Sequence, residues 1–222
     1  DPSGVGPWAE ELLGEAKPEV IYNTATGFTA DTFEQVTAAD PTQIIAVNQA
    51  VDARTKESLE EIAPTTVKPN GYEDWQVPWK KQVETIADAV GKEDEGDKLI
   101  DDTEKAFEEF RHEHAELQDK SAAIVMPYDG KIGLYTEEDG RGQFIEDLGM
   151  EIPDALQGDG GSFFVDIAPE NYAKLNQVDY LFVLDYNGSS AALKKDKTFQ
   201  GLDSVKDGRV RYLDTDTGNA MS

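Results

Sequence analysis

Short apolar runs alternate with helical segments along most of this chain, and this alternation limits the fold more than any other feature. The run PTQIIAVN (41–48) has consecutive apolar residues, which is typical of a strand in a sheet that is covered on both faces. Similar runs occur at 18–22, 121–128 and 178–186, and helical patterns at 29–40, 52–64, 140–150 and 168–176 separate them. The order predicts an α/β protein with parallel strands.

The middle of the chain has a different pattern. From Pro78 to about Gln118 there is no proline, and only Gly91 and Gly96 interrupt the helical pattern. Apolar residues recur here at three- and four-residue spacing among many Glu, Asp and Lys. A helix of roughly 25 residues is about 37 Å long, which is enough to connect two lobes. We therefore expect an α/β lobe at 1–77, a connecting long helix at 78–120 and a second α/β lobe at 121–222.

The charge of the chain excludes some classes of partner. Its 222 residues include 46 Asp and Glu against 20 Lys and Arg, so the formal net charge is −26. Nucleic-acid binding requires clustered cations, and an anionic membrane surface would repel this chain. The chain has no cysteine, which excludes a disulfide framework, a thiolate metal site and a cysteine nucleophile.

The sequence gives little support for catalysis. It has no G-x-S-x-G, Walker A or H-E-x-x-H motif, and no G-x-G-x-x-G follows a predicted strand. Its only histidines, His112 and His114, are two residues apart on a predicted helix and therefore project from different faces. We expect no catalytic residues, no protein-held metal and no cofactor. An α/β enzyme that uses carboxylates stays open as a less favoured alternative, as does an interaction module without a ligand.

Aromatic and amide residues gather where the predicted strands end. In open α/β sheets, ligands bind beyond the carboxyl ends of the strands. Aromatic groups with a few polar groups suit a bulky, partly apolar ligand. The strand ends carry Tyr22, Asn23, Asn48, Tyr128 and Tyr186, and nearby loops add Trp8, Tyr135, Arg141, Phe163 and Phe164. From the sequence alone, each of these is either a ligand contact or part of the core of a lobe.

Several phrases, in this order and spacing, resemble one family. They are TADTFEQVTAADPTQIIAVN, LEEIAPTTV, VPWKKQ leading into the long helix, GQFIEDLGMEIP, APENYAKLNQVDYLFVL and LDSVKDGRVRYLD. Together they resemble the iron-siderophore substrate-binding proteins of ABC importers, over nearly the whole chain. The resemblance implies two Rossmann-like α/β lobes joined by a single long α-helix, with the ligand cleft between the lobes.

The resemblance also implies a function. Such a protein performs no chemistry: it captures a ferric siderophore outside the cytoplasm and delivers it to the permease. It is expected to be a monomeric lipoprotein on the cell membrane, or a periplasmic protein, with an N-terminal lipid anchor that this sequence does not include. Haem and cobalamin are alternative ligands within the family. Relatives have further segments before PWAEELLG and after GNAMS, so we expect the first lobe to be incomplete in this chain.

The resemblance assigns roles to particular residues. Glu34 and Glu170 match the surface glutamates that meet permease arginines in relatives, and both are expected near the first turn of a helix, where a carboxylate is favoured in any case. Phe163 and Phe164 stand in the loop GDGGSFF (158–164), which lines the cleft in siderophore-binding relatives. We expect one of them to face the ligand and the other to pack in the core. Arg141 is the candidate partner for an anionic ferric complex.

Overall fold

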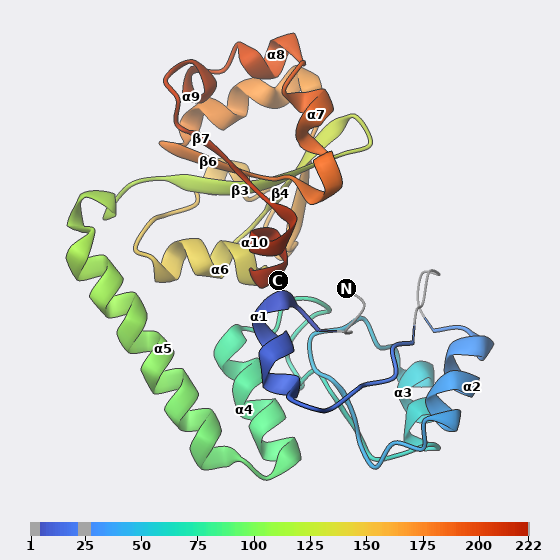
Figure 1. The fold of residues 1–222 in the computed structure, drawn as a ribbon. Helices are drawn as coiled ribbons and strands as arrows, with labels where there is room; N and C mark the ends of the chain where they lie inside the picture. The colour runs from blue at the N-terminus through green and yellow to red at the C-terminus, as the bar shows by residue number, and fades with distance from the viewer. Residues whose placement is uncertain (1–4, 22–27, 222) are drawn as a thin grey trace. The chain divides into compact units, whose positions relative to one another are not determined.

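The computed structural model describes residues 5–21 and 28–221, and the chain divides into two units, residues 1–101 and 102–222 (Figure 1). Each unit has its own sheet; the first unit has one apolar core and the second has two, among the described residues. Across the described residues, no helix has both the length and the apolar character that a membrane span needs.

The first unit is built on two short parallel strands. Strand β1 (Ile44–Ala46) pairs with β2 (Thr65–Val67), and Ile44 lies opposite Thr65. The other elements are α1 (Pro7–Glu10), η1 (Glu11–Leu13), α2 (Ala30–Ala38), α3 (Ala53–Glu60) and α4 (Trp79–Val90). The strand predicted at 18–22 is wrong for residues 18–21, which form no strand, and Tyr22 lies outside the described residues.

Side-chain caps explain where two of these helices begin. The Thr29 hydroxyl accepts a hydrogen bond from the Thr32 amide at 3.3 Å, and the Asp52 carboxylate accepts one from the Thr55 amide at 2.7 Å. Such caps satisfy amides that have no partner inside the helix. Apolar residues of α2, α3 and both strands then pack together, with Leu59 only 1% exposed.

The long helical segment is two helices instead of one. Helix α4 ends at Gly91, which adopts a left-handed conformation (φ 67°, ψ 42°), and α5 (Glu93–Glu113) begins two residues later. Glycine adopts this conformation at little cost, so it commonly ends a helix. Gly96 remains inside α5 because the helices approach closely there: a Cβ atom at Gly96 would lie 2.5 Å from the Cβ of Ala87. The expected single helix at 78–120 is therefore wrong, and α5 spans about 31 Å.

The second unit contains a five-stranded mixed sheet in the order β5-β4-β3-β6-β7. Strands β3 (Ala122–Tyr128), β6 (Tyr180–Leu184) and β7 (Val210–Leu213) are parallel, as the alternation predicts, whereas β4 (Lys131–Tyr135) and β5 (Phe164–Ile167) are antiparallel to their neighbours. The helical elements are η2 (Ala115–Leu117), α6 (Gly140–Asp147), η3 (Asp154–Leu156), η4 (Pro169–Gln177), η5 (Tyr186–Gly188), α7 (Ser190–Leu193), α8 (Lys197–Gln200), α9 (Asp203–Lys206) and α10 (Thr215–Ala220).

Both faces of this sheet are covered. Ala123 and Val125 of β3 belong to a core that includes residues of η4, α7 and α8, and Ile124 between them belongs to a separate core that includes Ile145 of α6. Figure 1 shows α7, α8 and α9 on one side of the sheet and α6 and α10 on the other. Successive side chains of a strand point to opposite faces, so β3 contributes to both cores.

The β3–β4 hairpin changes the environment of the two phenylalanines. Asp129 and Gly130 connect the strands with positive φ angles of 50° and 76°, and an Asp-Gly pair is typical of a two-residue hairpin turn. The predicted elements did not include β4 or β5. Because β5 begins at Phe164, only Phe163 stands in the predicted loop, and Phe164 is a strand residue.

We expect Gly142→Ala to destabilise the protein. Gly142 lies in the first turn of α6, where a Cβ atom would be 1.9 Å from the Thr136 carbonyl oxygen. This backbone contact cannot be relieved by turning a side chain, so the free energy of unfolding should fall by about 1–3 kcal/mol. Gly140→Ala in the same helix is the control, because a Cβ atom there has no neighbour within 4 Å. Urea unfolding of both variants checks this, and equal stabilities would contradict it.

Candidate functional site

Six of the eight predicted ligand residues belong to the second unit. They are Tyr128, Tyr135, Arg141, Phe163, Phe164 and Tyr186. The other two, Trp8 and Asn48, belong to the first unit, and Tyr22 and Asn23 lie outside the described residues. The six residues of the second unit come from three strands, a helix start, a loop and a 3-10 turn.

Phe164 is the centre of an aromatic cluster. Its ring lies 5.2 Å from the ring of Tyr135 in an edge-on arrangement, 5.6 Å from that of Tyr128 and 6.1 Å from that of Phe163. The register of β4 and β5 produces this cluster, because Tyr135 and Phe164 are paired residues. The Phe164 ring covers Gly133, where a Cβ atom would lie only 1.6 Å from it. The missing side chain of Gly133 therefore makes room for Phe164.

Neither phenylalanine is fully buried. Phe163 and Phe164 are both half-buried, and Phe164 packs at the margin of the core that contains Ile145. The backbone carbonyl of Phe163 accepts a hydrogen bond from the Thr136 amide at 3.1 Å, which fixes the loop to the end of β4. Phe164 thus has the core contacts, whereas Phe163 lies next to it outside the strand. Which of them faces a ligand stays a prediction.

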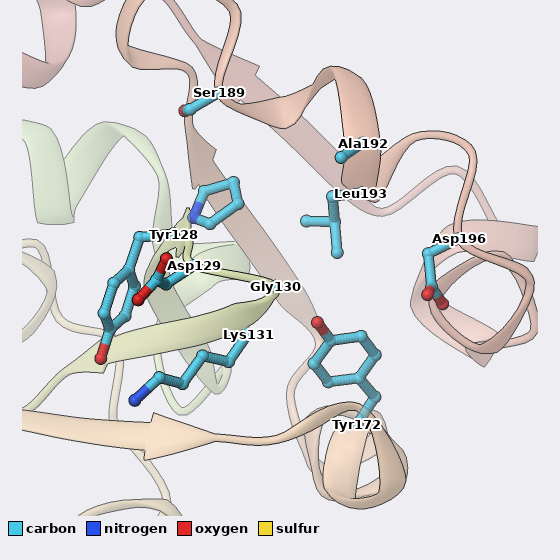
Figure 2. Close-up of a pocket in the computed structure, with 10 residues that line it drawn as sticks. Tyr128, Asp129, Gly130, Lys131, Tyr172, Ser189, Ala192, Leu193 and Asp196 are labelled. Carbon is cyan, nitrogen blue, oxygen red and sulfur yellow. The ribbon is translucent and has the colours of Figure 1, made fainter.

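Tyr128 ends β3 in a polar network with Lys131 and Asp166. The Tyr128 hydroxyl and the Lys131 ammonium donate hydrogen bonds to the two carboxylate oxygens of Asp166. The ammonium also lies 5.1 Å from the centre of the Tyr128 ring, and Figure 2 shows both polar groups on the same side of the hairpin. The hydrogen bonds from Lys131 and Tyr128 lower the pKa of Asp166. The Tyr128 hydroxyl therefore has a protein partner in this structure.

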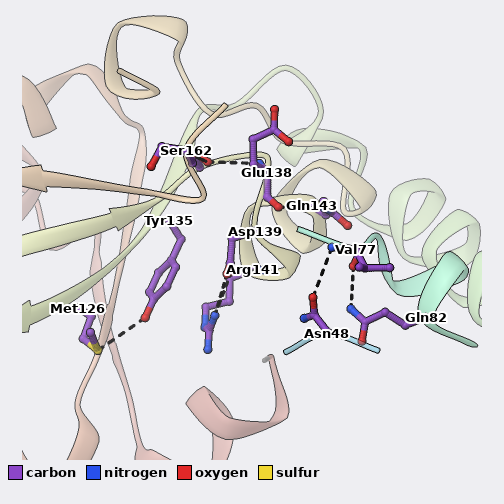
Figure 3. A network of polar contacts seen from close by, with 11 residues as sticks. Asn48, Val77, Gln82, Met126, Tyr135, Glu138, Asp139, Arg141, Gln143 and Ser162 are labelled. Atoms are coloured by element: carbon purple, nitrogen blue, oxygen red, sulfur yellow. Dashed lines mark hydrogen bonds and ion pairs between the residues drawn. The ribbon is translucent and has the colours of Figure 1, made fainter. Parts of the chain in front are cut away.

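Arg141 lies at the start of α6 in a largely buried ion pair. The Asp139 carboxylate accepts a hydrogen bond from the Arg141 amide at 2.8 Å, and Nη1 of Arg141 donates to its two oxygens at 3.0 and 3.1 Å (Figure 3). The side chains of Arg141 and Asp139 are only 14% and 7% exposed. Burial raises the pKa of Asp139, and the positive charge of Arg141 opposes this rise.

The buried Nε of Arg141 has no hydrogen-bond partner among the described residues. The guanidinium carbon lies 4.3 Å from the centre of the Tyr135 ring. A buried donor without a partner is rare and needs an explanation. The Arg141 side chain as a whole is still partly exposed, so the rest of the guanidinium can meet a ligand, and arginine is well suited to oxygen-rich anions.

Tyr135 places a neutral phenol ring beside the Arg141 guanidinium. Its side chain is 6% exposed, and its hydroxyl donates a hydrogen bond to the sulfur of Met126 at 3.6 Å (Figure 3). Burial raises the pKa of Tyr135 to about 12, against the opposing charge of Arg141. Tyr186, which follows β6, is half-buried in the same core, and it also contributes to the raised pKa of Tyr135.

Trp8 and Asn48 have different surroundings in the first unit. The side chain of Trp8 in α1 is 53% exposed. The side-chain oxygen of Asn48 accepts a hydrogen bond from the Val77 amide at 3.4 Å, and Gln82 donates to the Val77 carbonyl at 2.8 Å (Figure 3). Asn48 therefore has a structural bond within its own unit, and Trp8 presents a large aromatic surface.

The two glutamates predicted to dock a permease are exposed. Glu170 stands in the first turn of η4, as expected. Glu34 does not: α2 begins at Ala30, so its first turn contains Asp31, and Glu34 falls in the second turn. The helix dipole acts mainly within the first turn, so it gives Glu34 less support than the sequence suggested.

The sequence analysis missed three polar residues of the site. Asp139 had a signal, because an Asp directly before a helical segment is typical of an N-cap. No sequence pattern indicated Lys131 or Asp166. Their contact depends on the strand register that pairs Gly133 with Asp166. Within residues 5–21 and 28–221, no group of three or more His, Cys, Asp or Glu is arranged to hold a metal ion.

Comparisons with known proteins agree on one family. The sequence profile of the family described as "Periplasmic binding protein" matches residues 4–217. Among curated proteins, the "Probable siderophore-binding lipoprotein YfiY" of Bacillus subtilis (strain 168) is 23% identical over 222 residues. That match covers 94% of this chain and 65% of the Bacillus protein, so the chain spans slightly less than two thirds of its relative.

Two solved structures are similar over nearly the whole chain. The periplasmic solute binding protein of Mycobacterium smegmatis (strain MC2 155) has a TM-score of 0.83 and 26% identity, with 100% of this chain and 75% of that one covered. PiaA of Streptococcus pneumoniae TIGR4 in complex with ferrichrome has a TM-score of 0.79 and 25% identity, with 98% and 74% covered. Both the sequence profile and the fold thus point to the same family.

The buried phenol of Tyr135 should make stability depend on pH in the alkaline range. The native state keeps its proton up to about pH 12, whereas an unfolded tyrosine releases it near pH 10. The native state therefore binds more protons between these values, and the free energy of unfolding should fall by about 2–3 kcal/mol as the pH rises through them. Urea unfolding at several pH values measures this. Tyr135→Phe should lose this part of the slope and Tyr72→Phe should keep it; an unchanged slope in Tyr135→Phe would contradict the assignment.

Proposed function

Because this chain belongs to the periplasmic binding protein family, we propose that it captures a ferric siderophore for an ABC importer. The iron would be held by the siderophore, and the protein would present the complex to the permease without chemical change. The names of the relatives support this: one is a probable siderophore-binding lipoprotein, and another was solved with ferrichrome. We propose an extracytoplasmic, lipid-anchored protein, as the lipoprotein name of the Bacillus relative suggests, and one that acts as a monomer.

The observation that carries the proposal is the partly exposed guanidinium of Arg141 beside an aromatic cluster. A ferric siderophore combines oxygen-rich iron coordination with a bulky organic frame. The guanidinium of Arg141 would donate to those oxygens, and the rings of Tyr135, Phe164 and Phe163 would pack against the frame. The arginine is held by Asp139 and by the face of Tyr135, so little entropy would be lost when a ligand binds.

The two units would act as the lobes of a binding protein, with α5 as the connector. Trp8 and Asn48 would contribute to ligand binding from the first lobe, and Tyr128 and Tyr186 from the second. The exposed glutamates Glu34 and Glu170 would contact arginines of the permease, one from each lobe. The scheme involves binding without chemical change of the ligand, which is compatible with a family described as periplasmic binding proteins.

Tryptophan fluorescence of the mature full-length protein tests the ligand class. The panel holds ferrichrome, a ferric catecholate, a ferric citrate-type siderophore, haem and cobalamin. We expect saturable quenching at sub-micromolar concentration by one ferric siderophore class. Quenching by haem alone with a Soret shift, or by cobalamin alone, would replace the siderophore with that ligand, and silence across the panel would overturn the proposal.

Arg141→Lys should weaken ferric siderophore binding by about tenfold or more. Lysine keeps the positive charge near Asp139 but lacks the planar fork and the Nε donor. Arg211→Lys is the matched control, because Arg211 is exposed on the edge strand β7, where its guanidinium donates to the backbone carbonyls of Gly208 and Val210. Quenching titrations of both variants, with circular dichroism as a check on folding, decide the point. Equal affinity in Arg141→Lys and the unmodified protein would remove Arg141 from the site.

The double variant Glu34→Gln/Glu170→Gln should bind the siderophore normally but deliver it slowly. Loss of both carboxylates removes the ion pairs proposed with the permease, so siderophore-dependent iron uptake by cells should fall several-fold. Glu57→Gln/Asp154→Asn removes the same charge from exposed positions of the same two units and should transport normally. Uptake that is equally slow in both double variants would point to net charge instead of docking.

A further inference from the structure

A cavity of about 340 Å³ opens beside the β3–β4 turn, separate from Tyr135, Arg141 and Phe164. Its walls come from the hairpin, from η4 and from the segment around α7 and α8 (Figure 2). The lining residues that matter here are Pro127, Asp129, Tyr172, Leu193 and Asp196. Its volume is at the lower end of the range for small-molecule sites.

Tyr172 points its hydroxyl into this cavity (Figure 2). The residue is only 2% exposed, and its ring packs edge-on against Phe199 with centroids 6.1 Å apart. The hydroxyl has no hydrogen-bond partner in the part of the chain that the structure describes. A tyrosine hydroxyl that opens onto a cavity can both donate and accept hydrogen bonds, so an occupant of the cavity could bond to it.

Two carboxylates line the same cavity and have capacity to accept hydrogen bonds. Asp129, in the hairpin turn, has neither an ion pair nor a hydrogen bond with another described residue. Asp196 caps α8 through one oxygen, which accepts from the Phe199 amide at 2.8 Å, and its other oxygen has no partner among the described residues. Burial, and then the negative charge of Asp196, raise the pKa of Tyr172.

The one lysine of the lining does not neutralise these carboxylates. Lys131 donates to Asp166, which is not part of the lining, and Figure 2 shows its ammonium turned away from Tyr172. Pro127, Ala192 and Leu193 supply apolar surface between the polar groups. The cavity thus combines a short apolar wall with two carboxylates, those of Asp129 and Asp196, and with the Tyr172 hydroxyl.

We propose that this cavity binds an alkylguanidinium or alkylammonium group. The carboxylates of Asp129 and Asp196 would accept its N–H bonds, the Tyr172 oxygen would accept another, and the alkyl chain would lie against Leu193 and Pro127. The proposal goes beyond siderophore capture and does not depend on it.

Butylguanidinium and butylurea test the proposal, because they have nearly the same shape and differ in charge. Each is titrated into the full-length protein in 150 mM salt, and backbone amide shifts are followed by NMR. We expect saturable shifts centred on Gly130, Tyr172 and Ser189 with butylguanidinium and butylammonium. Butylurea should bind at least about tenfold more weakly, because it lacks the charge-assisted bonds.

Conservative variants assign the contacts. Tyr172→Phe keeps the ring against Phe199 and should weaken butylguanidinium binding several-fold. Asp129→Asn suits the positive φ of the turn, Asp196→Asn can still cap α8, and the pair together should cost about tenfold or more. Asp154→Asn, an exposed carboxylate elsewhere in the unit, is the control and should change nothing.

Three results would overturn the proposal. They are equal binding of butylurea, unchanged affinity in all the cavity variants, and shifts spread without saturation over the acidic surface. The last would show general attraction to a chain with a net charge of −26. Quenching of tryptophan fluorescence by the siderophore, measured on the same variants, distinguishes the cation proposal from the siderophore proposal. The cavity variants should bind the siderophore normally even where cation binding is lost.

Discussion

The antiparallel register of β3, β4 and β5 determines most of the chemistry of the second unit. At one end it pairs Tyr135 with Phe164 and so assembles the aromatic cluster. At the other it pairs Tyr128 with Lys131 around the Asp129–Gly130 turn. A slip of one residue would move every side chain of the shifted strand to the opposite face. The aromatic rings would then separate, and Asp166 would lose its hydrogen bonds with Tyr128 and Lys131. Gly133 helps to hold the register, because only glycine leaves room for the Phe164 ring.

The two faces of the sheet carry different candidate sites. Tyr135 and Phe164 pack with Ile145 on the face covered by α6, whereas Tyr172 and Leu193 belong to the core on the face covered by η4, α7 and α8. The hairpin contributes to both, and Tyr128 lines the cavity while its ring also contacts Phe164, so the sites share a scaffold and one residue at their border. A ligand bound on one face would therefore influence binding on the other face mainly by making the shared β3–β4 hairpin more rigid.

The net charge of the chain and the local charge at each candidate site act differently on a ligand. A net charge of −26 would repel an anionic ligand at long range, but screening at physiological salt limits this effect to roughly 8 Å. Within that distance the guanidinium of Arg141 is the cation closest to the aromatic cluster; Asp139 balances its charge, and its partly buried position strengthens the hydrogen bonds that it makes. The reverse holds at the cavity beside the β3–β4 turn, where local and overall charge have the same sign and would favour a cation together.

The sequence by itself determined the α/β class, the helices at 30–38, 53–60 and 140–147 and the parallel core strands, because periodicity and capping are local properties. It also marked Arg141 and the aromatic residues of the candidate site. Only the tertiary structure decided that Phe164 is a strand residue, that Asp139 holds Arg141 and that Tyr172 faces a cavity. These contacts join residues whose relation depends on strand register and on the packing of helices over a sheet. No spacing in the sequence encodes them, since they result from the best burial of the whole chain.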